Sequence, residues 1–343
     1  MTETDDTGDA ADADEASEYL TEAEIAEGGP VDCGLLAARM ETGVDAILVV
    51  LLDRAGRRLV ELDWKPGTGF VFRSTDIAGD VPRGIGNASV AGRMLVAHDA
   101  EGSVRTLDRE TGEIGSIPNL PSPVVVMPRG DKLIAATDRG LLTIGLWNRD
   151  GKKPWFAAGI EPLLVKDIDN PGGMILLPGT DPGHFILAIG CYGAIELITV
   201  ADRAGPNDGY EVITSQTVPA RGLAHDPVIV AHPPFAVPAL TGPWVYAQDD
   251  GGTGLIALDV RTTSIVPYPH GSAGYGSVRR ACASVDSDAC LVVGRDGRAF
   301  HWRPGHEPRQ VGLDGGLPLL WQGDRGLVMD RDRPILRDTI LPW

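Results

Sequence analysis

The sequence predicts an all-β fold built as a ring of small antiparallel sheets. One phrase returns along the chain: a short apolar strand, a turn with Asp and Gly, and a second apolar strand, as in residues 95–108. This phrase is the local signature of a β-hairpin. Its copies begin at Ile47, Leu95, Leu133, Phe185, Val245, Leu291 and Leu327, and the copy at Phe185 carries Cys191 where the others carry Asp. Self-similarity at roughly 35 to 60 residues indicates a repeat architecture.

An apolar segment precedes each hairpin and is predicted to form the innermost strand of its sheet. These seven segments are residues 34–40, 88–91, 123–127, 173–177, 228–231, 281–285 and 317–321. Turn residues such as Gly, Pro and Asp follow most of them, which favours a tight reversal into the hairpin. Seven inner strands predict seven blades.

Outer strands are predicted after six of the hairpins. They cover residues 69–74, 113–117, 155–158, 210–217, 264–268 and 309–313. The last sheet lacks one, and an unpaired edge invites association. We expect residues 18–26 to complete it as its outer strand, so that the N- and C-terminal segments pair and close the ring. Because Ser17, Thr21 and Glu24 resemble helix N-cap signals, a short capping helix remains the alternative.

With these strands assigned, the chain resembles the β-propeller repeat superfamily, which includes WD-repeat and quinoprotein-like rings. The resemblance covers residues 31–343 and lies in period and pattern only. The Trp-Asp pair of WD repeats is absent from the third strands, where the chain has Leu62-Asp63-Trp64 or Leu107-Asp108. No cofactor signature of the quinoprotein enzymes maps onto the chain. The resemblance therefore implies a fold, and we predict no cofactor.

The charge of the chain is concentrated at its N-terminus. The 343 residues have a formal net charge of −18, and the first 30 residues contain 11 acids and no base. The remainder therefore has a net charge of −7. We predict a disordered acidic tail over residues 1–16 and a single β-propeller domain over residues 17–343. No basic patch emerges, so nucleic acid is not an expected partner.

The sequence also bears on location and redox state. It starts without the positive and apolar regions of a secretory signal, and its longest apolar run, residues 46–52, is too short to span a bilayer. We expect a cytoplasmic protein without a membrane partner. Cys282 and Cys290 could face each other across one hairpin through a turn near residues 285–287, but cytosolic thiols are expected to stay reduced.

Candidate binding residues come from one face of the predicted ring. The loops before the inner strands share this face with the turns between second and third strands, and three of these loops, residues 159–171, 219–226 and 269–280, are long and polar. The candidate ligand-binding residues are Arg83, Asn87, Asp167, Arg221, His270, Tyr275 and Arg279. Arg83 and Arg221 share an Arg-Gly turn, whose alternative explanation is structural.

Two functions are compatible with this face. The leading one is a monomeric binding or scaffold propeller of the cytosol that recognises a protein or a small polar or anionic molecule. The alternative is an enzyme of lyase or isomerase type, with His225 as general base and arginines holding an anionic group. A metal site from His225, His270 and Asp167 gains no support from spacing, so we predict no metal. The repeated Asp of the hairpin turns is predicted to cap its own turn.

Overall fold

The structure is a computed structural model, and the fold is described over the following residues. They are 22–24, 33–40, 46–53, 57–79, 86–91, 93–99, 103–117, 120, 123–127, 132–148, 155–203, 209–221, 223, 227–231, 244–249, 254–269, 278–313, 316–329 and 335–341. The predicted acidic tail, residues 1–16, lies outside these ranges.

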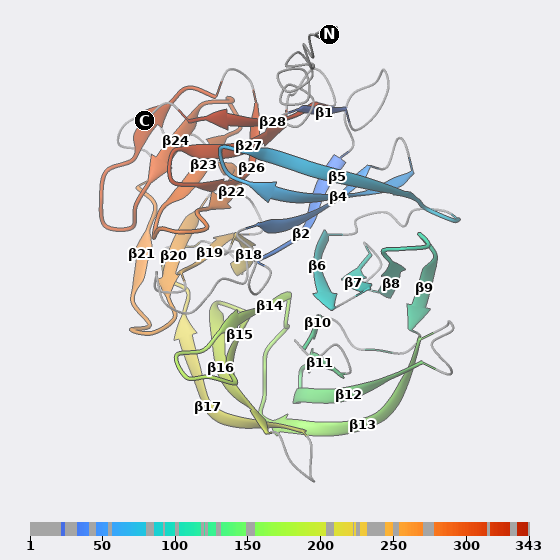
Figure 1. The fold of residues 1–343 in the computed structure, drawn as a ribbon. Coiled ribbons are helices and arrows are strands. Elements are labelled where there is room, and N and C mark those ends of the chain that lie inside the picture. The colour runs from blue at the N-terminus through green and yellow to red at the C-terminus, as the bar shows by residue number, and fades with distance from the viewer. Residues whose placement is uncertain are drawn as a thin grey trace, which may run out of the picture.

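The described residues form seven four-stranded antiparallel sheets and no helix (Figure 1). In chain order we call them sheets 1 to 7. Their first strands are β2 (Cys33–Met40), β6 (Gly86–Ala91), β10 (Val124–Val126), β14 (Gly173–Pro178), β18 (Pro227–Ala231), β22 (Val278–Ala283) and β26 (Leu317–Gln322). Their second strands are β3 (Ile47–Asp53), β7 (Met94–His98), β11 (Lys132–Thr137), β15 (His184–Cys191), β19 (Trp244–Asp249), β23 (Cys290–Gly294) and β27 (Arg325–Met329).

The outer half of each sheet completes this pattern. The third strands are β4 (Arg58–Lys65), β8 (Val104–Asp108), β12 (Gly140–Asn148), β16 (Ala194–Arg203), β20 (Leu255–Asp259), β24 (Ala299–Trp302) and β28 (Ile335–Ile340). The fourth strands are β5 (Gly69–Asp76), β9 (Ile114–Ile117), β13 (Trp155–Val165), β17 (Gly209–Pro219), β21 (Ile265–Pro267), β25 (Arg309–Val311) and β1 (Glu22–Glu24). All seven predicted inner strands overlap a first strand, and the all-β class is confirmed.

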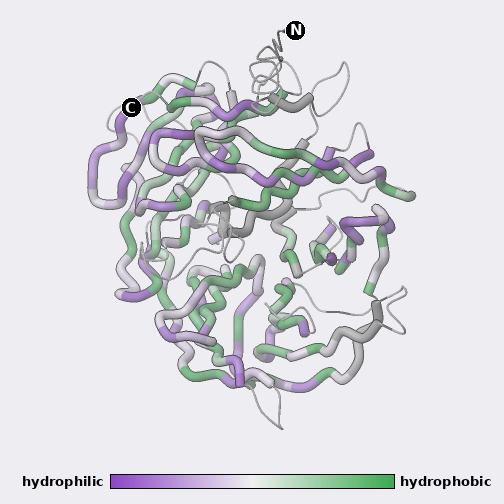
Figure 2. The backbone as a smooth tube through the Cα atoms, viewed as in Figure 1, coloured by the Kyte–Doolittle hydropathy of each residue, from purple (hydrophilic) through white to green (hydrophobic). Residues whose placement is uncertain are grey.

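Each second strand is apolar on both faces because it is packed between two neighbouring sheets. In β3, Ile47, Val49 and Leu51 contact residues of sheet 7, while the alternating residues Leu48 and Val50 contact sheet 2. Side chains alternate along a strand, so a strand covered on both sides reads as one unbroken apolar run. Figure 2 shows the hydrophobic residues concentrated along the strands.

Seven hydrophobic clusters separate the sheets, one between each consecutive pair. Six of them join sheets that follow one another in the chain. The seventh brings the two ends of the chain together, since it contains Leu62 and Trp64 of β4 together with Leu327 and Leu336 of sheet 7. Sheet 7 therefore contacts sheets 6 and 1.

Sheet 7 takes its fourth strand from the N-terminal part of the chain. β1 pairs antiparallel with β28, and Ala23 lies opposite Leu336 (Figure 1). Residues 22–24 are thus a strand rather than part of a short helix, and the rest of the 18–26 segment lies outside the described residues.

A second contact joins sheets 7 and 1. The carboxylate of Asp338, only 1% exposed, accepts hydrogen bonds from the backbone N–H groups of Gly67 (2.9 Å) and Gly69 (3.1 Å), in the turn between β4 and β5.

Two sequence predictions need correction. Residues 159–165 were expected in a loop, but they continue β13. Two register shifts in its pairing with β12 skip Gly159 and Leu163, and Pro162 lies opposite Leu142. Cys282 and Cys290 do not face each other, because the register of β22 and β23 places Cys282 opposite Leu291 and Cys290 opposite Ala283. Both thiols are free and buried, and they contribute to different hydrophobic clusters.

The predicted role of the repeated Asp is confirmed at Asp99 and Asp296. Asp99 Oδ1 accepts a hydrogen bond from the Ser103 N–H (2.8 Å), and Asp296 Oδ1 accepts one from the Arg298 N–H (3.0 Å). Each of these aspartates also forms an ion pair with an Arg that follows the turn: Asp99 with Arg105 (2.7 Å) and Asp296 with Arg298 (2.6 Å). In the turn of sheet 3, the Thr137 hydroxyl takes this role in place of Asp138 and accepts a hydrogen bond from the Arg139 N–H (3.1 Å).

Among the described residues, no helix has the length and apolarity to cross a membrane.

Candidate functional site

The predicted site residues fall into three groups in the structure. Arg83, His225, His270 and Tyr275 lie outside the described residues. Asn87 in β6 and Arg279 in β22 are described as backbone positions only. Asp167 and Arg221 are described in full, and both are exposed on segments that flank sheet 4. Whether the predicted residues converge therefore remains a prediction, and the described part of the face is centred on sheet 4.

The turn between β15 and β16 organises this part of the face. Its Tyr192 N–H donates to the Asp169 carbonyl (2.9 Å), in the loop that precedes β14. On the other side, the Ala220 N–H, just beyond β17, donates to the Gly193 carbonyl (2.9 Å). The turn is thus held from both flanks, which brings the loop with Asp167 and the segment with Arg221 to the same turn.

Two apolar side chains stand out at this turn and at the end of β13. Tyr192 is 67% exposed, and Val165, the last residue of β13, is 83% exposed. We call the set Val165, Lys166, Asp167, Asp169, Tyr192 and Arg221 the Tyr192 surface. Most exposed apolar side chains are scattered singly, but here an aromatic and an aliphatic side chain flank one hydrogen-bonded loop.

The loop with Asp167 is anchored through a polar network behind the surface. Lys166 Nζ donates to Glu196 Oε2 (2.5 Å) on β16 and to the hydroxyls of Ser215 and Thr217 (3.1 Å each) on β17. Thr217 in turn donates to Glu196 Oε1 (2.5 Å). Glu196 is 4% exposed. A buried carboxylate needs such partners, because desolvation of an unpaired charge is costly.

The same loop is tied to sheet 3. The Lys166 N–H donates to the Arg139 carbonyl (3.2 Å), and the Ile168 N–H donates to the Asp138 carbonyl (3.1 Å). Asp138 and Arg139 form the turn between β11 and β12 and are exposed. Turns of two neighbouring sheets and the loop between them therefore form one continuous, rigid surface.

The cysteine beside Tyr192 is not a reactive group of this surface. Burial, together with the smaller effect of the negative charge of Glu196, raises the pKa of Cys191 to about 12. The thiolate is the reactive form of cysteine, so Cys191 stays a neutral packing residue at physiological pH.

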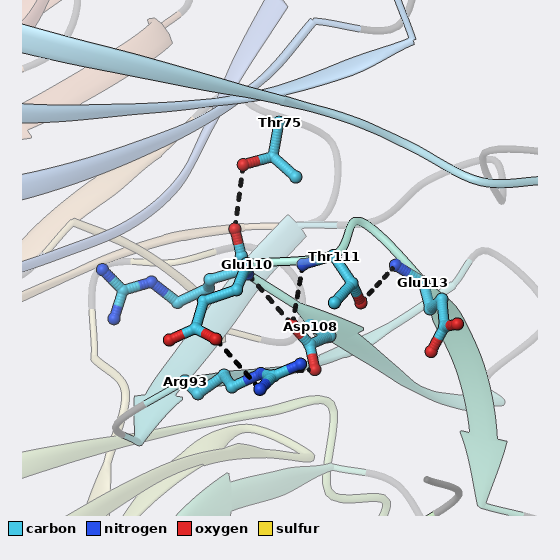
Figure 3. Close-up of polar contacts among 7 residues, drawn as sticks. Thr75, Arg93, Asp108, Glu110, Thr111 and Glu113 are labelled. Atoms are coloured by element: carbon cyan, nitrogen blue, oxygen red, sulfur yellow. Dashed lines mark hydrogen bonds and ion pairs between the residues drawn. The ribbon is translucent and has the colours of Figure 1, made fainter. Parts of the chain in front are cut away.

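A second polar cluster joins sheets 1 and 2 and is structural (Figure 3). Asp108 Oδ1 accepts hydrogen bonds from the N–H groups of Glu110 (2.9 Å) and Thr111 (3.0 Å), which caps the turn between β8 and β9. Arg93 bridges the carboxylates of Asp108 (2.7 Å) and Glu110 (2.9 Å). The Thr75 hydroxyl of sheet 1 donates a hydrogen bond to the carbonyl oxygen of Arg109, which directly follows Asp108 in this turn (2.9 Å). Arg93 thus pairs with two carboxylates of one turn, and Arg109 of the same turn pairs with Glu61 of sheet 1.

One histidine of the described residues has a shifted pKa. Burial lowers the pKa of His301 in β24, and the positive charges of Arg303 and Arg309 lower it further. Its ring packs edge-to-face on Trp321, with ring centroids 5.5 Å apart. His301 is thus a packing residue between sheets 6 and 7. Among the described residues, no group of three or more potential ligands could hold a metal ion.

Sequence reasoning named the loop with Lys166 and Asp167 but missed Tyr192 and the Lys166–Glu196 pair. One signal was present, because the hairpin at Phe185 replaces the usual Asp with Cys191 and places Tyr192 before the Gly. This turn departs from the repeat and exposes an aromatic side chain. The repeat pattern therefore does not explain why Tyr192 occupies this position.

Comparison with known proteins supports the fold. No protein-family model and no curated protein matches the chain. The solved β-propeller domain of Cps50 (Swd1) from Myceliophteria thermophila is similar over 92% of this chain and 98% of its own, with 12% identity and a TM-score of 0.50. Hydrazine synthase from Kuenenia stuttgartiensis has 10% identity and a TM-score of 0.48, and YCF48 bound to D1 peptide has 13% and 0.46, each over 92% of this chain and 98% of the other. Identity this low shows the fold alone, and the similarity to the Cps50 domain supports a β-propeller fold for this chain.

Proposed function

We propose that this β-propeller is a binding or scaffold protein that recognises a protein partner through the Tyr192 surface. The observation that carries the proposal is Tyr192 itself, which is 67% exposed on a turn hydrogen-bonded from both sides. A rigid exposed Tyr loses little conformational entropy on binding, and Tyr is enriched among residues that dominate protein interfaces. Val165 enlarges the apolar area, and Asp167 and Arg221 supply a polar rim.

We further propose that the seven sheets are the blades of one closed ring. Support comes from the hydrophobic cluster shared by sheets 7 and 1, from the pairing of β1 with β28, and from the hydrogen bonds of Asp338 to Gly67 and Gly69. A closed ring is a rigid scaffold for the loops on its face, which suits binding.

The lyase or isomerase alternative gains no support from the described residues, because its general base His225 lies outside them. The cytoplasmic location and the single domain over residues 17–343 stay predictions from the sequence.

Partner capture tests the proposed surface. Tagged wild-type protein is cross-linked in the cells that express it, and captured proteins are quantified by mass spectrometry beside the variants Tyr192→Ser and Phe72→Ser. Phe72 is a matched control, since it is an aromatic residue that is 47% exposed on β5 of sheet 1. We expect Tyr192→Ser to reduce capture of the specific partner about tenfold or more, as for an interface residue that dominates binding, and Phe72→Ser to leave it unchanged. Equal capture by all three proteins would contradict the proposal.

A further inference from the structure

The outer strands of the seven sheets differ in length. β13 and β17 contain 11 residues each and β5 contains 8, whereas β9 contains 4 and β21, β25 and β1 contain 3 each. A long outer strand presents a row of backbone N–H and C=O groups that can pair with another strand. Figure 1 shows β13 and β17 as long arcs on the outer margin of the molecule.

Two of the three long outer strands carry features that discourage such pairing. In β13, Pro162 lacks an N–H donor, Glu161 adds charge, and two register shifts make the strand irregular. In β5, Arg73 and Asp76 place charges of both signs on the strand. Charges, proline and bulges are the devices by which natural edge strands avoid association.

Residues 214–218 of β17 carry none of these devices, and the first proline, Pro219, is the last residue of the strand. Residues 214–218, Thr-Ser-Gln-Thr-Val, contain no charge, proline or glycine. They pair with residues 195–199 of β16 one by one, and the single register shift of the strand lies before them. Residues 213–217 are exposed in an unbroken run. The strand is also held in place, because Ser215 and Thr217 bind Lys166.

Charge is distributed symmetrically about this segment. Glu211 lies three residues before Thr214, and Arg221 lies three residues after Val218. In an antiparallel pair of identical strands, the start of one strand lies beside the end of the other. Two copies of β17 that pair in this way bring Glu211 of each copy, which already forms an ion pair with Arg203 of its own chain, toward Arg221 of the second copy.

We propose that the edge of β17 is a homodimer interface, in which residues 214–218 pair antiparallel with the same residues of a second copy of this chain, with the two-fold axis at Gln216. The interface is a continuous sheet across the two subunits, formed by backbone hydrogen bonds and flanked by two Glu211–Arg221 ion pairs. This proposal goes beyond the binding function of the Tyr192 surface and replaces the monomer predicted from the sequence.

The first test is the molar mass of the full chain in solution. Sedimentation velocity over roughly a hundredfold range of concentration is expected to show a monomer–dimer equilibrium for the wild type. Gln216→Lys places two like charges at the two-fold axis, so we expect it to raise the dissociation constant at least about tenfold. Gln310→Lys is the matched control, because Gln310 is exposed on the short outer strand β25. We expect this variant to dimerise as the wild type does.

Charge reversal identifies the register. Glu211→Arg and Arg221→Glu are each expected to weaken the dimer, and the double variant is expected to restore it. Hydrogen exchange gives an independent readout that needs no substitution: the amides of residues 214–218 should become protected as the concentration rises, while those of β25 should not. A wild-type protein that stays monomeric at all concentrations would overturn the proposal. Pairing of β17 with a strand of a different protein, without formation of a homodimer, would overturn it as well. So would a Gln216→Lys variant that dimerises normally.

Discussion

Buried carboxylates on third strands hold turns and loops to the sheets. Glu61 on β4 forms an ion pair with Arg109 in the β8–β9 turn of sheet 2, and Asp338 on β28 binds the β4–β5 turn of sheet 1. Glu196 on β16 binds Lys166 of the preceding loop. A buried carboxylate is stable only when its oxygens accept hydrogen bonds or pair with a positive charge. Each of these carboxylates therefore favours the one position of its turn or loop that supplies those partners.

The Lys166–Glu196 pair provides a prediction at this scale. Lys166→Met leaves the Glu196 carboxylate buried with Thr217 as its remaining described side-chain partner. We expect a loss of about 2 to 3 kcal/mol in the free energy of unfolding, since removing one partner leaves a buried charge uncompensated. The double variant Lys166→Met with Glu196→Met should recover most of this loss. Urea denaturation measures both, and a single variant as stable as the wild type would show that the pair contributes nothing.

At the scale of the element, hydrophobic pattern and turn residues predicted strand positions well and strand lengths less well. The inner strands were found because each is a short apolar segment followed by a recognisable turn. The outer strand of sheet 3 was predicted over residues 155–158, and residues 159–171 were predicted to form a long polar loop. In the structure this outer strand continues to Val165, because its pairing with β12 skips Gly159 and continues through Pro162, which lies opposite Leu142. Whether a strand continues past a Gly or a Pro depends on its pairing with the neighbouring strand, so the length of β13 cannot be predicted from its own sequence alone.

The site was less predictable than the fold for a related reason. The loop with Asp167 was identified from its polarity, but Glu196 lies 29 residues further along the chain, within an apolar strand. Its pairing with Lys166 depends on how sheet 4 packs beside the loop. Tyr192 was passed over because a lone Tyr beside a Gly carries no motif.

Contacts between elements also limit which turn residues are allowed. Gly112 in the β8–β9 turn has φ +68°, and an added Cβ would lie 1.8 Å from the Asp76 carbonyl oxygen of sheet 1. We expect Gly112→Ala to lower the free energy of unfolding by about 2 to 5 kcal/mol, from the left-handed backbone and the clash together.

Gly305 provides the matched control for this variant. It lies in the corresponding turn of sheet 6 with φ +83°, and an added Cβ would meet nothing within 4 Å. Gly305→Ala should therefore lose only about 1 kcal/mol, the backbone contribution alone. Equal losses in the two variants, measured by thermal unfolding, would mean that the turn of sheet 2 does not press against sheet 1.

At the scale of the whole molecule, the proposed closure of the ring depends on how the two ends of the chain meet. Every sheet packs against the next through its own hydrophobic cluster, but the boundary of sheets 7 and 1 joins segments from opposite ends of the chain. Among the described residues, β1 contributes three to sheet 7, and it covers the edge of β28. An uncovered β28 would expose its backbone groups, and Ile340 is already 62% exposed there.

Deletion of N-terminal residues tests the closed ring most directly. Removing residues 1–30 takes away β1, whereas removing residues 1–15 leaves it in place. In thermal unfolding with parallel light scattering, we expect the longer deletion to lower the Tm by at least about 5 °C or to aggregate before unfolding. The shorter deletion should match the full chain in both measurements. Identical melting of the two truncated proteins, without aggregation, would contradict closure of the ring by pairing of the N- and C-terminal segments.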